Sequence, residues 1–78
     1  MKEIKIVEDD QAMSHELKQL LESEGYRVEE TKRFDHLTDD LLQSDADLIL
    51  LDINLPGVNG EEILRRIRKE RETPVIML

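Results

Sequence analysis

Apolar side chains recur along the chain with two different periods, and these periods predict alternating strands and helices. Short runs rich in Val, Ile and Leu occupy residues 4–7, 47–53 and 75–78, while residues 26–30 alternate apolar with polar positions. Such runs are typical of strands, and the alternating run is typical of a half-exposed edge strand. Between them, apolar residues recur every three or four positions, as on one face of a helix. The order of the segments predicts the arrangement βαβαβαβ.

The three predicted helices have recognisable ends. The first covers about residues 10–24, with Asp10 as a candidate N-cap and Gly25 as its stop, and the third begins after Asn59, a good N-cap. Their core-facing positions are expected to be Met13, Leu17, Leu20 and Leu21 in the first helix, Phe34, Leu37, Leu41 and Leu42 in the second, and Ile63, Leu64 and Ile67 in the third. Strands joined by helices through short connections favour a parallel α/β sheet with right-handed crossovers.

Length and charge narrow the class of protein. The 78 residues suffice for one small domain, and the formal net charge of −8 argues against a nucleic-acid-binding surface. On the third helix, the spacing of Glu61 with Arg65 and of Glu62 with Arg66 predicts ion pairs along its outer side. The chain has no cysteine and no apolar stretch near the length of a membrane span, so we expect a cytoplasmic protein without membrane contact.

Carboxylates follow two of the predicted strands. Glu8, Asp9 and Asp10 come after the first strand, and Asp52 closes the run of the third. If these strands lie side by side and parallel, their acidic groups meet at one edge of the sheet. Such a cluster suits Mg²⁺ and phosphoryl chemistry. Without a metal ion the acids should repel one another, and at least one of their pKa values should rise.

The segments at residues 4–10, 52–60 and 73–78 together resemble the receiver domain of bacterial two-component response regulators. Two acids after the first strand, then an Asp followed by x-x-Leu-Pro-Gly-x-Asn-Gly, carry this resemblance. It is greatest to receivers joined to winged-helix (OmpR/PhoB-type) transcriptional regulators. It implies a flavodoxin-like (CheY-like) sheet with strand order 2-1-3-4, in which residues 1–78 form a receiver domain that is incomplete at its C-terminus.

The resemblance also implies a role for each residue of the motifs. Asp52 is expected to be the phospho-acceptor, which takes its phosphoryl group from a sensor histidine kinase. The expected Mg²⁺ ligands are Glu8, Asp9, Asp52 and the backbone carbonyl of Asn54, with Asp9 binding directly and Glu8 through water. The residues expected to shape the loop are Pro56, Gly57 and Gly60. Such a domain is a switch rather than an enzyme with an external product.

Two features of the family are missing from these residues. Receivers carry a Ser or Thr after the fourth strand and a Lys after the fifth, whereas Leu78 is the last residue here. We therefore expect this segment to keep metal binding but not to switch. The fourth strand would be a bare edge, and the first helix would also expose apolar surface, which predicts a homodimer formed through one of them.

Three other functions remain open at this point. A small phosphohydrolase with an Asp nucleophile is one, although those enzymes usually show Asp-x-Asp after the first strand. A histidine phosphotransfer module is the second, because the residues around His15 resemble the phospho-accepting box of sensor kinases; that module requires an all-helical chain. The third is an inactive folding or engineered fragment.

Overall fold

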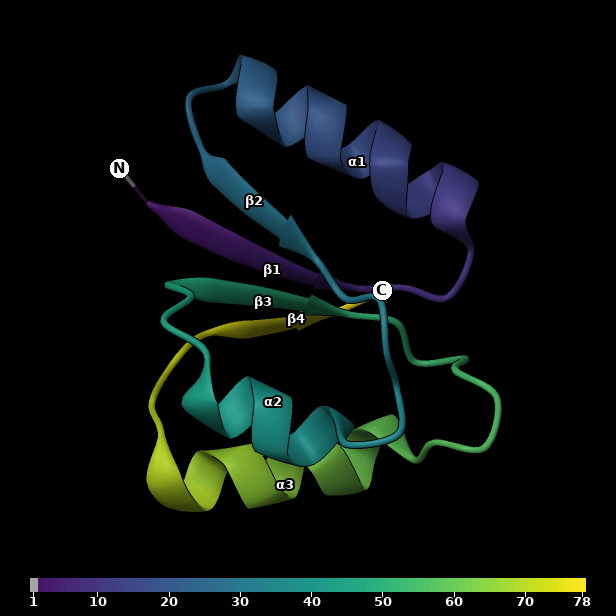
Figure 1. Cartoon of the computed structure of the whole chain (residues 1–78). Helices are drawn as coiled ribbons and strands as arrows, with labels where there is room; N and C mark the ends of the chain where they lie inside the picture. Colours follow the sequence, from purple (N-terminus) through teal and green to yellow (C-terminus); the bar gives the residue numbers. More distant parts are fainter. Residues whose placement is uncertain (1) are drawn as a thin grey trace.

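Seven elements alternate along the chain in the order that the sequence predicts. The computed structural model describes residues 2–78, and Figure 1 shows their arrangement. The elements are β1 (Glu3–Val7), α1 (Gln11–Ser23), β2 (Arg27–Glu30), α2 (Leu37–Gln43), β3 (Leu48–Leu51), α3 (Gly60–Glu70) and β4 (Val75–Met77). The second helix begins later than its apolar periodicity suggested, because Phe34 lies in the loop before it while still packing against the core. The predicted βαβαβαβ arrangement is confirmed.

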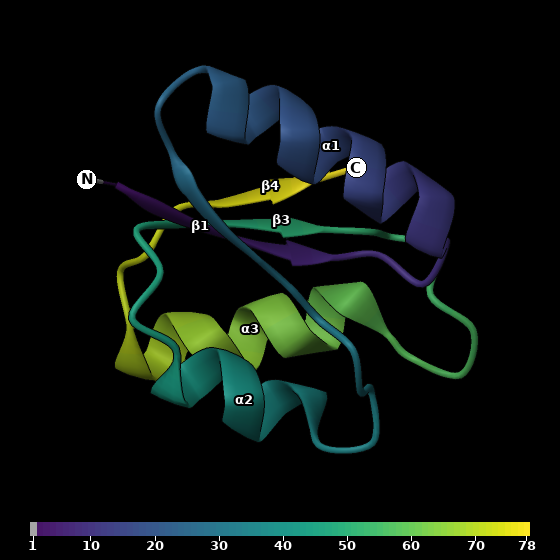
Figure 2. The same cartoon turned by 45° about the horizontal axis from the view of Figure 1, so that its top comes forward.

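The four strands form one parallel sheet with the order β2-β1-β3-β4. Helix α1 covers one face of the sheet, whereas α2 and α3 lie side by side against the other face (Figures 1 and 2). This is the flavodoxin-like topology that the sequence predicts. All carboxyl ends of the strands therefore lie at the same edge, which is where ligands bind in open α/β sheets.

Successive side chains of β1 and β3 point to opposite faces of the sheet. Ile4 and Ile6 join the apolar cluster beneath α1, while Val7, Ile49 and Leu51 join the larger cluster beneath α2 and α3. Both strands are covered on both faces, which explains the continuous apolar run of β3. In β1 the run is interrupted by Lys5, which is buried and pairs with Glu29. Full burial of each apolar side chain contributes about 1.5–3 kcal/mol. These two strands are the centre of the core.

The ends of the helices follow the sequence closely. The Asp10 carboxylate accepts from the Met13 N–H at 3.2 Å and caps α1, and Gly25 ends that helix with a φ of +96°. The Asn59 side chain accepts from the N–H groups of Glu61 and Glu62 at the start of α3. Each cap satisfies backbone donors that a helix end would otherwise leave unpaired.

Helix α1 departs from the expected pattern. Only Leu17 and Leu21 of its apolar stripe are half-buried, while Met13 is 48% and Leu20 is 60% exposed, so the prediction that all four lie in the core is wrong. The reason is that α1 contacts mainly β2 and β1, while both other helices of residues 2–78 lie on the opposite face of the sheet (Figure 1), so the outer flank of α1 meets no neighbouring helix. None of the helices within residues 2–78 is long and apolar enough to cross a membrane.

The far edge of the sheet also exposes apolar side chains. β4 pairs only with β3, as the sequence predicts for a bare edge strand. Ile76, which pairs with Leu50, and Leu78 lie on the same face of the sheet as α1 but are about half exposed, whereas Val75 and Met77 pack against the larger core cluster. An open strand edge beside exposed apolar groups is a common place for association.

The Arg71 side chain links the C-terminal ends of α2 and α3. Its guanidinium donates to the Leu41 carbonyl at the end of α2 at 2.7 Å and to the Ala46 carbonyl at 3.3 Å. The C-terminal carbonyls of a helix carry partial negative charge, so a cation there is favourable. The side chain thereby fixes the chain leaving α3 against the chain leaving α2.

Candidate metal centre

Three carboxylates meet at the edge formed by the carboxyl ends of the strands. Glu8 and Asp9 follow β1, and Asp52 follows β3. The parallel register pairs Val7 with Leu51, and the Asp52 N–H donates to the Val7 carbonyl at 2.9 Å. As a result, one oxygen from each of the three carboxylates lies within 4.8 Å of the other two. The convergence expected from the sequence is present.

The three acids lie in different environments. Glu8 is buried, Asp52 is half-buried and Asp9 is exposed. Backbone groups orient two of them: the Asp10 N–H donates to Glu8 at 3.2 Å, and the Asn54 N–H donates to Asp52 at 2.9 Å. Each of these bonds engages one carboxylate oxygen and limits rotation of the group. The second oxygen of each residue can then turn toward the shared space.

The electrostatics of the cluster are unfavourable without a cation. Burial raises the pKa of Glu8, the neighbouring Asp52 and Asp9 carboxylates raise it further, and the hydrogen bond from the Asp10 N–H opposes them. The expected rise of at least one pKa is confirmed. A divalent cation at this place would replace mutual repulsion with attraction, because a bound ion is often the largest local charge in such a site.

The loop after β3 has the backbone features that the sequence indicated. Gly57 has a φ of +69°, a conformation that favours glycine. Gly60 is buried at the start of α3, and a Cβ there would lie 3.2 Å from the Met77 side chain of β4. Pro56 and Asn54 are exposed in the same loop. Gly60 therefore permits close packing of α3 against the end of the sheet.

One residue near the centre has a role that the motif did not suggest, and a second has only the capping role expected of it. Leu55 is buried and anchors the loop in the core cluster, so this segment is more than a polar turn. An apolar residue inside a Pro-Gly loop was the only signal for this in the sequence. Asp10, the third acid of the first cluster, lies outside the carboxylate group and instead caps α1.

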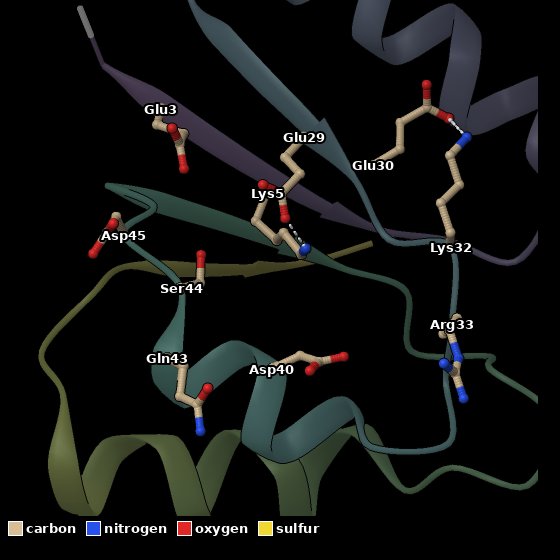
Figure 3. Close-up of a pocket in the computed structure, with 10 residues that line it drawn as sticks. All are labelled: Glu3, Lys5, Glu29, Glu30, Lys32, Arg33, Asp40, Gln43, Ser44 and Asp45. Atoms are coloured by element: carbon tan, nitrogen blue, oxygen red, sulfur yellow. Dashed lines mark hydrogen bonds and ion pairs between the residues drawn. The ribbon is translucent and has the colours of Figure 1, made fainter.

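A separate polar hollow of about 530 Å³ opens between α2 and the β1–β2 side of the sheet (Figure 3). The Lys5 ammonium forms an ion pair with Glu29 inside it, and Lys32 pairs with Glu30 on its wall. None of the three clustered carboxylates lines this hollow. Its charges are largely matched within the chain, so the carboxylate cluster is the better candidate for chemistry.

His15 does not lie in a histidine phosphotransfer module. It belongs to α1, directly after β1, and its Nδ1 lies 3.7 Å from the Glu30 carboxylate. A four-stranded sheet is incompatible with the all-helical module that such a histidine requires. That alternative is therefore excluded.

The family is shown by comparison with known proteins. The family model described as the response regulator receiver domain matches residues 4–78. The chain belongs to this family. Among curated relatives, ResD of Bacillus subtilis (strain 168) is 39% identical over 75 residues, which cover 96% of this chain and 31% of ResD. CpxR of Escherichia coli (strain K12) is 41% identical over 78 residues, which cover all of this chain and 33% of CpxR. The chain thus spans about a third of these OmpR/PhoB-family regulators.

Solved structures agree with this membership. The N-terminal domain of the nisin resistance regulator NsrR is 35% identical, with a TM-score of 0.88 over 99% of this chain and 65% of that one. TrrA of Thermotoga maritima, described in complex with Mg²⁺ and BeF, is 30% identical, with a TM-score of 0.82 over 99% of this chain and 66% of that one. TrrA is also described in complex with the histidine kinase ThkA; there it is 31% identical, with a TM-score of 0.83 over 99% of this chain and 67% of that one.

Replacement of Glu8 should show the cost of the carboxylate cluster as a pH-dependent stability difference. The ordinary pKa of this group is 4.5, and it is raised in the folded chain, so ionisation of Glu8 disfavours folding. Glu8→Gln keeps an acceptor for the Asp10 N–H but removes the charge. Below the ordinary pKa of 4.5 the variant and the native chain should have the same free energy of unfolding. As the pH rises from 4.5 through the raised pKa of Glu8 in the folded chain, the variant should become progressively more stable than the native chain.

Urea denaturation in EDTA, from about pH 4 to about pH 8, measures this difference. Glu16→Gln is the matched control, because Glu16 is exposed on α1 and outside the carboxylate cluster. A gain for Glu8→Gln that does not change with pH would contradict the electrostatic account of the cluster.

Proposed function

We propose that this chain is the phospho-accepting part of a response regulator, in which Asp52 receives a phosphoryl group from a sensor histidine kinase with Mg²⁺ bound beside it. The observation that carries the proposal is the convergence of Glu8, Asp9 and Asp52 at the ends of two adjacent parallel strands. Membership in the receiver family supports it, as do the descriptions of TrrA with Mg²⁺ and BeF and with a histidine kinase.

The donor set fits magnesium. Mg²⁺ prefers carboxylate, carbonyl and water oxygens at about 2.1 Å, which places opposite ligands about 4.2 Å apart. The three carboxylate oxygens lie within 4.8 Å of one another, near enough to share one such ion directly or through water. The ligands would be Asp9 and Asp52 directly, the carbonyl of Asn54, and Glu8 through water. When bound, the ion would neutralise the clustered carboxylates and the charge of the arriving phosphoryl group.

The chain's own residues then perform the transfer. The hydrogen bond from the Asn54 N–H holds one oxygen of Asp52, so its other oxygen is presented at the sheet edge. That oxygen attacks phosphorus, the P–N bond to the donor histidine breaks, and its electron pair returns to the imidazole nitrogen. Pro56, Gly57 and Gly60 keep the loop in the shape that leaves this edge open. The product is an acyl phosphate on Asp52, later removed by water.

In this proposal the chain is a switch in the cytoplasm rather than an enzyme with an external product. It makes no direct contact with nucleic acid or membrane, in keeping with its net charge of −8. The relatives are transcriptional regulators, and DNA contact would come from parts of such proteins that these residues do not include. That the segment alone does not switch stays a prediction.

Labelling with acetyl phosphate tests the acceptor. With Mg²⁺ present, the chain should incorporate label that is absent in EDTA and absent from Asp52→Asn, because the amide is no nucleophile. Asp45→Asn is the matched control, since Asp45 is exposed and outside the carboxylate cluster, and it should label normally. Intact mass spectrometry after short incubation provides the readout.

Two results would contradict the proposal. Label retained in Asp52→Asn would place the acceptor elsewhere, and absence of label in the native chain with Mg²⁺ would favour an inactive fragment. Rapid multiple-turnover release of phosphate from simple phosphate esters would instead favour the phosphohydrolase alternative.

We also propose that two copies of the chain associate, through either the β4 edge or the outer flank of α1. The support is the open edge of β4 with exposed Ile76 beside it, and exposed Met13 and Leu20 on α1. Sedimentation equilibrium at tens of micromolar should show a dimer. Ile76→Lys should dissociate it if β4 is the interface and Leu20→Lys if α1 is. A monomeric native chain would contradict the association.

A further inference from the structure

The C-terminal half of α3 carries a group of cations that have no acidic partner. Across residues 2–78, no carboxylate lies within 4 Å of these side chains, and all four are exposed. They are Arg65, Arg66, Arg68 and Lys69. Most other cations of the chain are matched: the ion-paired ones are Lys5, Lys18, Arg27, Lys32 and Arg33. Unmatched positive charge is therefore concentrated on one helix of an acidic chain.

The ion pairs predicted within α3 do not form, which leaves this group unneutralised. Neither Glu61 with Arg65 nor Glu62 with Arg66 is within ion-pair distance, so that prediction is wrong. The helix instead separates its charges, with acids in the first turn and bases in the last. Both placements are favoured by the helix dipole, and the exposed pairs that do not form would have contributed little to stability.

A hollow adjoins these cations. It has a volume of about 350 Å³ between α2 and α3, and Leu42, Arg66, Lys69 and Glu70 line it. The two helices lie side by side on the face of the sheet opposite α1 (Figures 1 and 2). The surface therefore offers two cations and one carboxylate, Glu70, beside an apolar side chain. The excess of positive charge favours an anionic group, and Leu42 favours an aliphatic one.

The charges around the group select the kind of anion. Acidic residues lie on α3 at both ends of the group of cations, with Glu61 and Glu62 before it and Glu70 after it. The whole chain has a net charge of −8. A long polyanion such as DNA carries a charge about every 1.7 Å and would meet these acids as well as the cations. A short acidic segment can contact Arg66 and Lys69 beside Leu42 and meets only Glu70 among these acids. Arg is also well suited to such contacts, because its planar guanidinium binds carboxylates with two hydrogen bonds.

We propose that the surface formed by Arg66, Lys69 and Leu42, with Arg65 and Arg68 adding positive charge on the same helix, docks a short acidic segment of a partner protein that carries an aliphatic residue among its carboxylates. Docking of this kind is weak and falls with ionic strength, because the contacts are exposed. It contributes to partner choice through charge complementarity. Docking at this surface does not require Asp52 or a bound metal ion. A negative result here would therefore not contradict the proposal that Asp52 is the phospho-acceptor.

An NMR titration tests the docking surface. The probe is the capped peptide Glu-Glu-Leu-Glu-Glu, added at low salt to the ¹⁵N-labelled chain. Saturable shifts should concentrate at Leu42 and at the last two turns of α3. Arg66→Gln with Lys69→Gln should weaken binding about tenfold, because two exposed ion pairs are lost and each contributes modestly. Lys18→Gln with Arg27→Gln is the matched control, because those cations already face carboxylates.

Each other outcome overturns the inference. Equal affinity of the two double variants would show that net charge alone attracts the peptide, and shifts centred away from α3 would place binding elsewhere. Tighter binding of a DNA duplex or of anionic vesicles than of the peptide, at the same ionic strength, would assign the surface to a different partner. Circular dichroism of both variants verifies that they remain folded.

Discussion

The parallel pairing of β1 with β3 is the constraint on which the site and most of the core depend. One set of backbone hydrogen bonds fixes Val7 beside Leu51, and the residues that follow each of them are then acids. The same pairing places Ile6 and Ile49 at the centre of the two apolar clusters. A shift of the register by one residue would send every side chain of a strand to the opposite face. Burial of the apolar side chains therefore also determines where the carboxylates meet.

The carboxylate cluster works against the stability of the fold that creates it. Glu8 is held in a buried position where its charge is disfavoured by burial and by two neighbouring acids. The apolar groups of β1 and β3 on either side offset this local cost. Such a balance is common at functional sites, where residues suited to chemistry are not those that would give the highest stability. A divalent cation bound among the three carboxylates would reverse this penalty.

Elements fixed by local chemistry could be predicted from the sequence. The apolar runs of β1 and β3, the caps Asp10 and Asn59, and Gly25 with positive φ all follow from a few neighbouring residues. The carboxylate cluster followed because parallel topology brings the strand ends together. The resemblance to a known family gave the order of the strands, which periodicity alone could not.

Features decided by distant neighbours could not be predicted. Met13 and Leu20 have helical spacing like that of core residues, but their burial depends on whether another element covers that flank of α1. The reach of Arg71 to the carbonyls of Leu41 and Ala46 depends on how α2 and α3 meet. The pairs that spacing predicts within α3 are absent, because an exposed ion pair contributes too little to hold two long side chains together.

The most direct test of the central claim is a calorimetric titration of the chain with Mg²⁺. If the ends of β1 and β3 together form one centre, a single ion should bind per chain, and both Asp9→Asn and Asp52→Asn should remove that binding. Asp10→Asn, which keeps a side-chain cap for α1, should bind the ion as the native chain does. Binding that survives both replacements, or that is lost only in Asp10→Asn, would contradict a site shared by the two strands.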